Sequence, residues 1–112
     1  MSSTSKQKGS AHERAVVDYL KANGWKHAER RLAGDKNDRG DIAGVPGIVL
    51  ECKNEKRIDL AQYMRELEVE VANDKADAGA AIVKKRGTTD VADYYAVMPV
   101  YMLVHLLKKA GY

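Results

Sequence analysis

The sequence has little cysteine, no long apolar run and no strong excess of one charge. The single cysteine, Cys52, excludes an internal disulfide and fits a reducing compartment. No apolar run approaches the roughly 18 residues of a membrane-spanning helix, and no signal-peptide pattern is present, so we expect a soluble, cytoplasmic protein without a membrane partner. The net charge of +3 on 112 residues is mild, so any phosphate-binding surface must come from local clustering of lysine and arginine.

The most informative stretch is Gly40–Lys53, with the sequence GDIAGVPGIVLECK. It predicts a short strand carrying Asp41, a glycine-bounded turn and a second strand over Ile48–Lys53. The two-residue period of a strand places Glu51 and Lys53 on one face, roughly 6.5–7 Å apart along the axis. If the strands pair as a hairpin, Asp41 arrives beside Glu51, and two carboxylates and an ammonium meet at the end of a sheet.

Such a cluster has two interpretations. Two carboxylates held close repel each other, and a divalent cation relieves the repulsion by accepting oxygens from both. Mg²⁺ typically uses one or two protein carboxylates, and a neighbouring lysine can orient a water or stabilise charge on a phosphate. The alternative is a surface hairpin in which the lysine makes a cross-strand salt bridge.

The ordered set of motifs resembles the PD-(D/E)xK nuclease superfamily, and within it the archaeal-type Holliday junction resolvases, which also occur in phages. The pattern is D-(x)9-E-C-K, preceded by K-G-x-x-x-E-R at Lys8–Arg14 and R-x-A-G at Arg31–Gly34. The resemblance covers about residues 6 to 85. One departure is that Gly40, rather than proline, precedes Asp41.

The resemblance implies a Mg²⁺-dependent endodeoxyribonuclease, with Mn²⁺ expected to substitute. Asp41 and Glu51 would bind the metal with the backbone carbonyl of Cys52, and Lys53 would position the water or stabilise the pentavalent phosphorus. Glu13 would complete the site, directly or through a water. The expected substrate is a four-way DNA junction, cut symmetrically by a homodimer, and a phage-encoded member would act in the host cytoplasm.

The N-terminal region is expected to have two parts. Residues 1–9 are Ser- and Lys-rich and are predicted to be a flexible tail, and a helix is predicted to begin at Ser10. Ser10 and Glu13 have the spacing of a capping box, so Glu13 has both a capping interpretation and a metal-site interpretation. Asn23-Gly24 predicts the end of this helix.

Basic residues are candidates for contacts with the DNA backbone because guanidinium and ammonium groups match phosphate oxygens. The alternative for those in the predicted strand Trp25–Leu32 is a solvated edge. Asp35 and Asp38, in the loop before Gly40, are weaker rivals of Asp41 because a loop places acids less rigidly than a strand. The DNA-binding candidates are Lys8, Arg14, Arg30, Arg31, Lys56, Arg57, Lys84, Lys85 and Arg86.

A second helix is predicted from an N-cap at Asp59 to about Asn73. Gln62 completes a capping-box arrangement, and the resemblance gives it a second interpretation as a support for the site. The predicted buried stripe of this helix consists of Leu60, Met64, Leu67 and Val71. The acids predicted to be solvated are Glu66, Glu68 and Glu70.

The remaining elements are a buried strand over Ala78–Lys84 parallel to the preceding strand, a strand over Asp93–Met98 and a final helix from Pro99. This helix has a wide apolar arc, which predicts either a dimer interface or deep packing in a small domain. Its members are Val100, Met102, Leu103, Val104, Leu106 and Leu107.

Together these elements predict one α/β domain over residues 10–112, ordered α-β-β-β-α-β-β-α around a mixed sheet. The resemblance implies that this domain has a restriction-endonuclease-like fold. The favoured function is a Holliday junction resolvase. The alternatives are a nuclease that nicks branched, flap or duplex DNA, and a non-catalytic DNA-binding protein on a nuclease fold.

Overall fold

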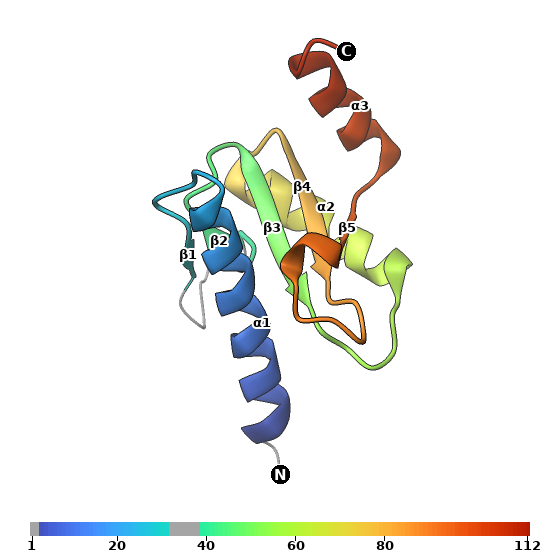
Figure 1. Ribbon diagram of the computed structural model, residues 1–112. Coiled ribbons are helices and arrows are strands. Elements are labelled where there is room, and N and C mark those ends of the chain that lie inside the picture. Colours follow the sequence, from blue (N-terminus) through green and yellow to red (C-terminus); the bar gives the residue numbers. More distant parts are fainter. Residues whose placement is uncertain (1–2, 32–38) are drawn as a thin grey trace.

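The computed structural model describes residues 3–31 and 39–112, with residues 3–8 described by their backbone alone. It confirms the α/β class and the mixed sheet. Five strands lie in the order β1-β2-β3-β4-β5, with β3 and β4 parallel and the other neighbours antiparallel. Helix α1 crosses one face of the sheet, and α2 lies on the other face (Figure 1).

Helix α1 runs from Ser3 to Ala22, so it begins seven residues before the predicted start. The interpretation of Ser10 as an N-cap is therefore wrong, and the predicted tail over residues 1–9 is helical from Ser3 onward. The physical reason is that Ser10 and Glu13 lie three residues apart on one helix face, which is also the spacing needed to contact a common partner in another element. That partner is Arg30, as described below.

The first three strands are β1 (Glu29–Arg30), β2 (Ile42–Ala43) and β3 (Ile48–Lys53). Strand β1 is much shorter than the predicted Trp25–Leu32, because a turn that includes the bond from the Ala28 N–H to the Trp25 carbonyl occupies its first half. The turn between β2 and β3 forms as predicted. It contains Gly44 at φ +92, where a Cβ atom would collide with the backbone of His27.

Helix α2 runs from Leu60 to Asp74. The predicted N-cap is confirmed, since the Asp59 carboxylate accepts a hydrogen bond of 3.1 Å from the Gln62 backbone N–H. Strand β4 (Ala78–Val83) follows and pairs in parallel with β3, as predicted from the crossover. The predicted buried stripe of α2 is confirmed at Leu67, with Met64 and Val71 partly buried against the same cluster, but it is wrong at Leu60, which is 49% exposed. The stripe also includes Tyr63 and Glu70, which are buried.

The chain ends with a short 3-10 helix η1 (Val91–Asp93), strand β5 (Tyr95–Val97) and helix α3 (Val100–Lys109). In Figure 1, α3 projects beyond the sheet toward the C-terminus. Met102 is its only buried residue and packs with Val49 and Leu67 on the α2 face of the sheet. The deep-packing alternative is therefore wrong for most of this helix.

The core is divided by the sheet. On the α1 face, Val17, Ile42 and Leu50 pack together, with Cys52 partly buried beside them. On the α2 face, Val49, Leu67 and Met102 form a second cluster. Alternate residues of β3 thus face opposite layers, which leaves Glu51 and Lys53 on the α2 side. Among the described residues, no helix combines the length and the apolar character needed to cross a membrane.

Candidate active site

The hairpin of β2 and β3 brings Asp41 to Glu51, as the sequence predicts, although Asp41 immediately precedes β2 and does not lie within a strand as predicted. Ile42 pairs with Leu50, and the Asp41 backbone N–H donates to the Leu50 carbonyl at 2.9 Å. The Asp41 side chain turns back along β3, where its Oδ2 accepts a hydrogen bond of 2.7 Å from the Cys52 backbone N–H. This bond fixes the aspartate at the position where the side chain of Glu51 leaves the strand.

Both carboxyl groups are buried enough to resist ionisation. Burial, followed by the charge of Glu51, raises the pKa of Asp41 to about 7, against the opposing effect of the Cys52 N–H. Burial, followed by a hydrogen bond with Glu70 and the charge of Glu70, raises the pKa of Glu51 to about 9. The pair therefore favours a bound proton or a bound cation over two free negative charges.

Glu70 is a member of this cluster that the sequence interpretation missed. It was predicted to be solvated, but its side chain is only 3% exposed. The available signal was its spacing from Tyr63 and Leu67, because steps of four and three residues place all three on one face of α2. The apolar pattern alone favoured a different stripe. A third carboxyl group thus lies next to Glu51 beneath the hairpin.

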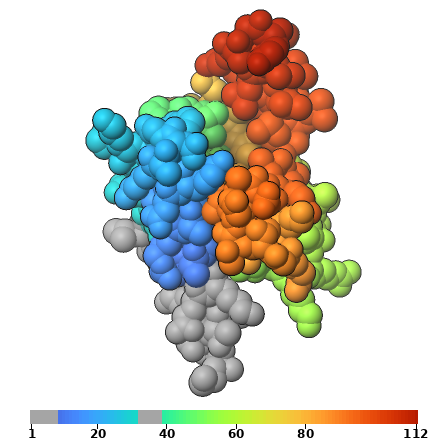
Figure 2. Space-filling model, in the orientation of Figure 1, coloured from blue at the N-terminus to red at the C-terminus, as the bar shows by residue number. Residues whose placement is uncertain are grey.

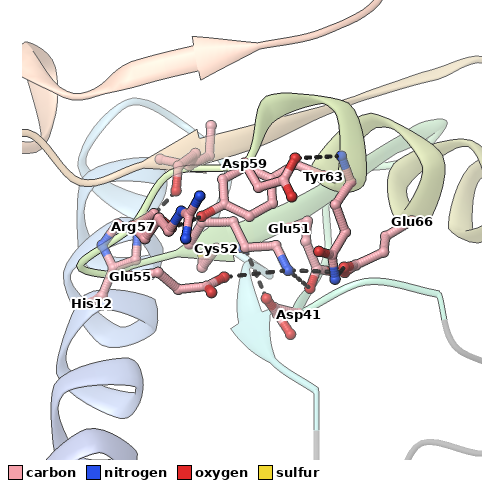
Figure 3. A network of polar contacts seen from close by, with 12 residues as sticks. His12, Asp41, Glu51, Cys52, Glu55, Arg57, Asp59, Tyr63 and Glu66 are labelled. Carbon is pink, nitrogen blue, oxygen red and sulfur yellow. Dashed lines mark hydrogen bonds and ion pairs between the residues drawn. The ribbon is translucent and has the colours of Figure 1, made fainter.

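Lys53 brings a positive charge to the site. Its Nζ lies 3.0 Å from Glu66 Oε2, 3.9 Å from Glu51 Oε1 and 4.0 Å from Glu55 Oε1. Figure 3 shows Glu51, Glu55 and Glu66 close together, with the dashed lines of these ion pairs between them and Asp41 just beneath them in the view. Nζ also lies 4.9 Å from the ring centroid of the buried Tyr63, a cation–π contact.

The lysine is held in its charged form. Burial acts to lower its pKa, but the hydrogen bond with Glu66 and the charges of Glu51, Glu66 and Glu55 outweigh burial, so the pKa of Lys53 is raised. Its side chain is 13% exposed, so the charge is close to the surface without being fully solvated. A fixed ammonium of this kind suits electrostatic stabilisation better than proton abstraction.

Gln62 takes part in the N-cap through its backbone, but its side chain points to Glu66 instead of completing a capping box, and its role as a support for the site stays a prediction. Its backbone N–H is the donor to the N-cap at Asp59, and its side-chain Nε2 donates to Glu66 Oε1 at 3.1 Å. Glu66, predicted to be solvated, is instead the main partner of Lys53. The Gln62 side chain therefore contacts Glu66, and Glu66 in turn contacts Lys53.

Glu13 faces the sheet from α1, and its main partner is Arg30. Arg30 Nε donates to Glu13 Oε1 at 2.9 Å, and Arg30 Nη2 donates to Ser10 Oγ at 3.1 Å. The capping-box interpretation of Glu13 is therefore wrong. The charge of Glu13 also contributes to the raised pKa of Asp41. A role at a metal stays a prediction.

The basic residues predicted to contact DNA fall into distinct groups. Arg30 pairs with Glu13, and Arg31 Nη2 lies 3.7 Å from Asp74 Oδ1 with only 18% of its side chain exposed, so the proposed ridge of these two arginines is largely engaged with acids. Arg14 and Arg57 are exposed. Lys56, Lys84, Lys85 and Arg86 line one cleft beside α1. The side chain of Lys8 and the rival acids Asp35 and Asp38 lie outside the described residues.

The chemistry of the donors can be tested against a Mg²⁺ ion. Within residues 3–31 and 39–112, no group of three or more His, Cys, Asp or Glu side chains is arranged to hold a metal. A site of two carboxylates, completed by waters and a phosphate, needs no such group, and Asp41 and Glu51 fit it because their proximity disfavours two unshared negative charges. The Cys52 thiol packs toward α1, and burial raises its pKa, so it is unsuited to nucleophilic chemistry.

Comparisons with known proteins add nothing to this geometry. No protein-family model matches the chain, and no curated protein or solved structure is significantly similar to it. The functional argument therefore rests on the residues and their arrangement.

Proposed function

We propose that this chain is a Mg²⁺-dependent, structure-selective DNA endonuclease of the PD-(D/E)xK type, with a restriction-endonuclease-like fold and four-way junctions as its preferred substrate. One observation carries the proposal: Asp41, Glu51 and Lys53 converge at the end of the β2–β3 hairpin, with the two carboxyl pKa values raised and the ammonium retained.

The proposed reaction is hydrolysis of a phosphodiester. A water oxygen forms a bond to phosphorus, the P–O3′ bond breaks, and the products are a 5′-phosphate and a 3′-hydroxyl, as in the family that the sequence resembles. Asp41 and Glu51 would hold the Mg²⁺, with the Cys52 carbonyl and a water-mediated contribution from Glu13. When bound, the metal would lower the pKa of a ligated water and neutralise phosphate charge.

The protein groups have separable roles in this proposal. Asp41 is fixed by the Cys52 N–H, so one carboxylate is oriented before substrate binds. Lys53, aligned by Glu66, would stabilise the negative charge that develops on the phosphate oxygens. Gln62 and Glu66 act through the lysine and are positioning residues.

Junction resolution needs two symmetric cuts, and a two-fold homodimer would supply two sites facing opposed strands. The chain would act in the cytoplasm on DNA. The two alternatives, a general nicking nuclease and an inert DNA-binding protein, predict different outcomes on the same substrates.

The test is cleavage of equal-length labelled DNAs: a mobile four-way junction, a flap and a linear duplex, each with Mg²⁺ or with EDTA. The Mg²⁺ concentration is about 10 mM, which is high enough to fill a weak carboxylate site that keeps several waters. Paired symmetric cuts in the junction alone, abolished by EDTA, are the expected result. Cutting of all three DNAs would select the general nuclease. Tight binding to every DNA without cutting would contradict the proposal and select the inert binder.

A further inference from the structure

A cleft lies beside the candidate active site, between α1 and the loops that follow β3 and β4. Its volume is about 1040 Å³, and Tyr94 and Tyr95 complete its lining. Figure 2 shows the two sides of this region on one face of the molecule, where α1 (blue) meets the segment containing η1 and β5 (orange). Glu55 connects the cleft to the candidate active site, because it lines the cleft and its Oε1 lies 4.0 Å from Lys53 Nζ.

The cleft is positively charged. Four cations line it, Lys56, Lys84, Lys85 and Arg86, against the single carboxylate of Glu55, whose charge is shared with Lys53. Within the described part of the chain, none of these four cations forms an ion pair. A set of basic groups without acidic partners along one cleft suits a ligand with several phosphates.

The cleft also presents aromatic surface. Tyr95 is 50% exposed, and Lys84 Nζ lies 5.7 Å from the ring centroid of Tyr94. The buried His12 packs against Tyr94, with the two ring centroids 5.5 Å apart. His12 is itself anchored by a hydrogen bond of 2.9 Å from its Nε2 to the Ile82 carbonyl. The nitrogen is the donor in this bond because a carbonyl oxygen can only accept.

We propose that this cleft binds an unpaired segment of a DNA strand, with phosphates on the basic side chains and a base against the ring of Tyr95. Aromatic faces combined with a positive groove are the usual means of holding single strands, whereas the bases of a duplex are stacked inside the helix and present no free face. The inference deepens the proposed nuclease function, on which it rests for the choice of DNA: the substrate would have unpaired nucleotides next to the phosphate at Lys53.

The test measures binding without cleavage. Fluorescein-labelled single-stranded oligonucleotides and their duplex counterparts are titrated with protein in EDTA, and anisotropy is recorded. Their length is about 20 nucleotides, which exceeds the roughly 4–16 nucleotides of a single-strand site. The expected result is tighter binding of the single strand than of the duplex at equal ionic strength. Tyr95→Ala should weaken single-strand binding about tenfold, the usual effect of losing one stacked base, and change duplex binding less than about twofold.

Two variants separate stacking from folding. Tyr95→Phe keeps the aromatic face and should keep single-strand affinity, and Tyr101→Ala removes a tyrosine of similar exposure on α3 and should change neither affinity. If Tyr95→Ala does not fold, the Lys85→Ala/Arg86→Ala variant provides the test, because both side chains are exposed. It should weaken single-strand binding and reduce the slope of log affinity against log salt by roughly 1.4, for two lost phosphate contacts.

Equal affinity for single strand and duplex, or loss of both in Tyr95→Ala, would overturn the inference. Failure of the nuclease proposal has a different signature. Single-strand preference that depends on Tyr95, together with no cleavage of any DNA in Mg²⁺, would leave the cleft assignment standing and remove the enzyme. Junction cleavage in Mg²⁺, together with single-strand binding that Tyr95→Ala does not change, would support the nuclease proposal and exclude the cleft as a single-strand site.

Discussion

Asp41 and Glu51 are held together where neither is fully solvated, and this arrangement opposes folding when both are ionised. Their pKa values in the folded protein, about 7 and about 9, lie above the ordinary values of 3.8 and 4.5. The folded state thus binds more protons than the unfolded state between these values. The resulting stabilisation is fully present below about pH 4 and is lost as the pH rises through 7 and then 9.

Asp41→Asn should therefore stabilise the metal-free protein at pH 8, by about 1–2 kcal/mol, since one pKa unit corresponds to about 1.4 kcal/mol. The asparagine oxygen can still accept the Cys52 N–H hydrogen bond, so the hairpin contact is kept. The difference from wild type should shrink at pH 4. Urea unfolding in EDTA at the two pH values measures it, and destabilisation of the variant at pH 8 would support the salt-bridge interpretation instead.

Lys53→Met tests the ammonium. Methionine retains much of the packing over Tyr63 but removes the charge that would stabilise the reacting phosphate, so single-turnover cleavage of the junction should fall by about 10²–10³. DNA affinity should change less than about twofold, because one ammonium near the surface is a small part of the phosphate contacts. Lys109→Met, which removes a lysine paired with Asp77 on the exposed surface, is the matched control and should cleave like wild type. Retained cleavage in Lys53→Met would exclude the proposed role.

Among the elements, the β2–β3 hairpin could be predicted from sequence, because strand alternation and turn residues are local signals. The parallel pairing of β4 could be predicted because a crossover helix separates it from β3. The start of α1 could not, because Ser10 and Glu13 satisfy a local capping pattern and a tertiary contact with Arg30 equally well. The spacing of Glu70 from Tyr63 and Leu67 was a signal for its burial, but the partners of Glu66 and Glu70 could not be predicted. These partners, Lys53 and Glu51, lie in another element, and the orientation of α2 that brings them together depends on packing.

Gly44→Ala tests the turn on which the site depends. A Cβ at Gly44 would meet the His27 backbone, and the φ of +92 is unfavourable for other residues, so we expect a loss of at least about 2 kcal/mol in unfolding free energy. Gly87→Ala is the control: its φ of +83 imposes similar backbone strain, but a Cβ there meets open space. It should cost about 1 kcal/mol. Urea titration compares the two, and equal losses would show that the contact with His27 is unimportant.

On the scale of the whole molecule, α3 leaves apolar side chains exposed. Val100 is 73% exposed, Leu103 45%, Val104 41% and Leu107 39%. The sequence predicted the wide apolar arc but could not distinguish a covered helix from one that projects, because that depends on how far the sheet extends beneath it. A second copy of the chain is the proposed partner of this surface, since symmetric junction cutting needs two sites.

We therefore expect the protein to sediment as a dimer at micromolar concentration. Leu103→Glu/Val104→Glu should shift it to monomer, because two charges would replace apolar contacts in the proposed interface. Val69→Glu, a change at a 54% exposed position on α2, is the control and should leave the dimer intact. A wild-type monomer at 100 µM, a concentration well above about 1 µM, would exclude this interface as a functional one.

The proposal that Asp41, Glu51 and Lys53 share one cation and one phosphate is tested most directly by cleavage of a labelled four-way junction with wild type and Asp41→Asn, each in Mg²⁺ and in EDTA. The substitution keeps the size of the side chain and its hydrogen bond to Cys52. We predict cuts by wild type in Mg²⁺ alone and none by the folded variant under either condition. Cleavage by wild type in EDTA, or undiminished cleavage by Asp41→Asn, would contradict the account.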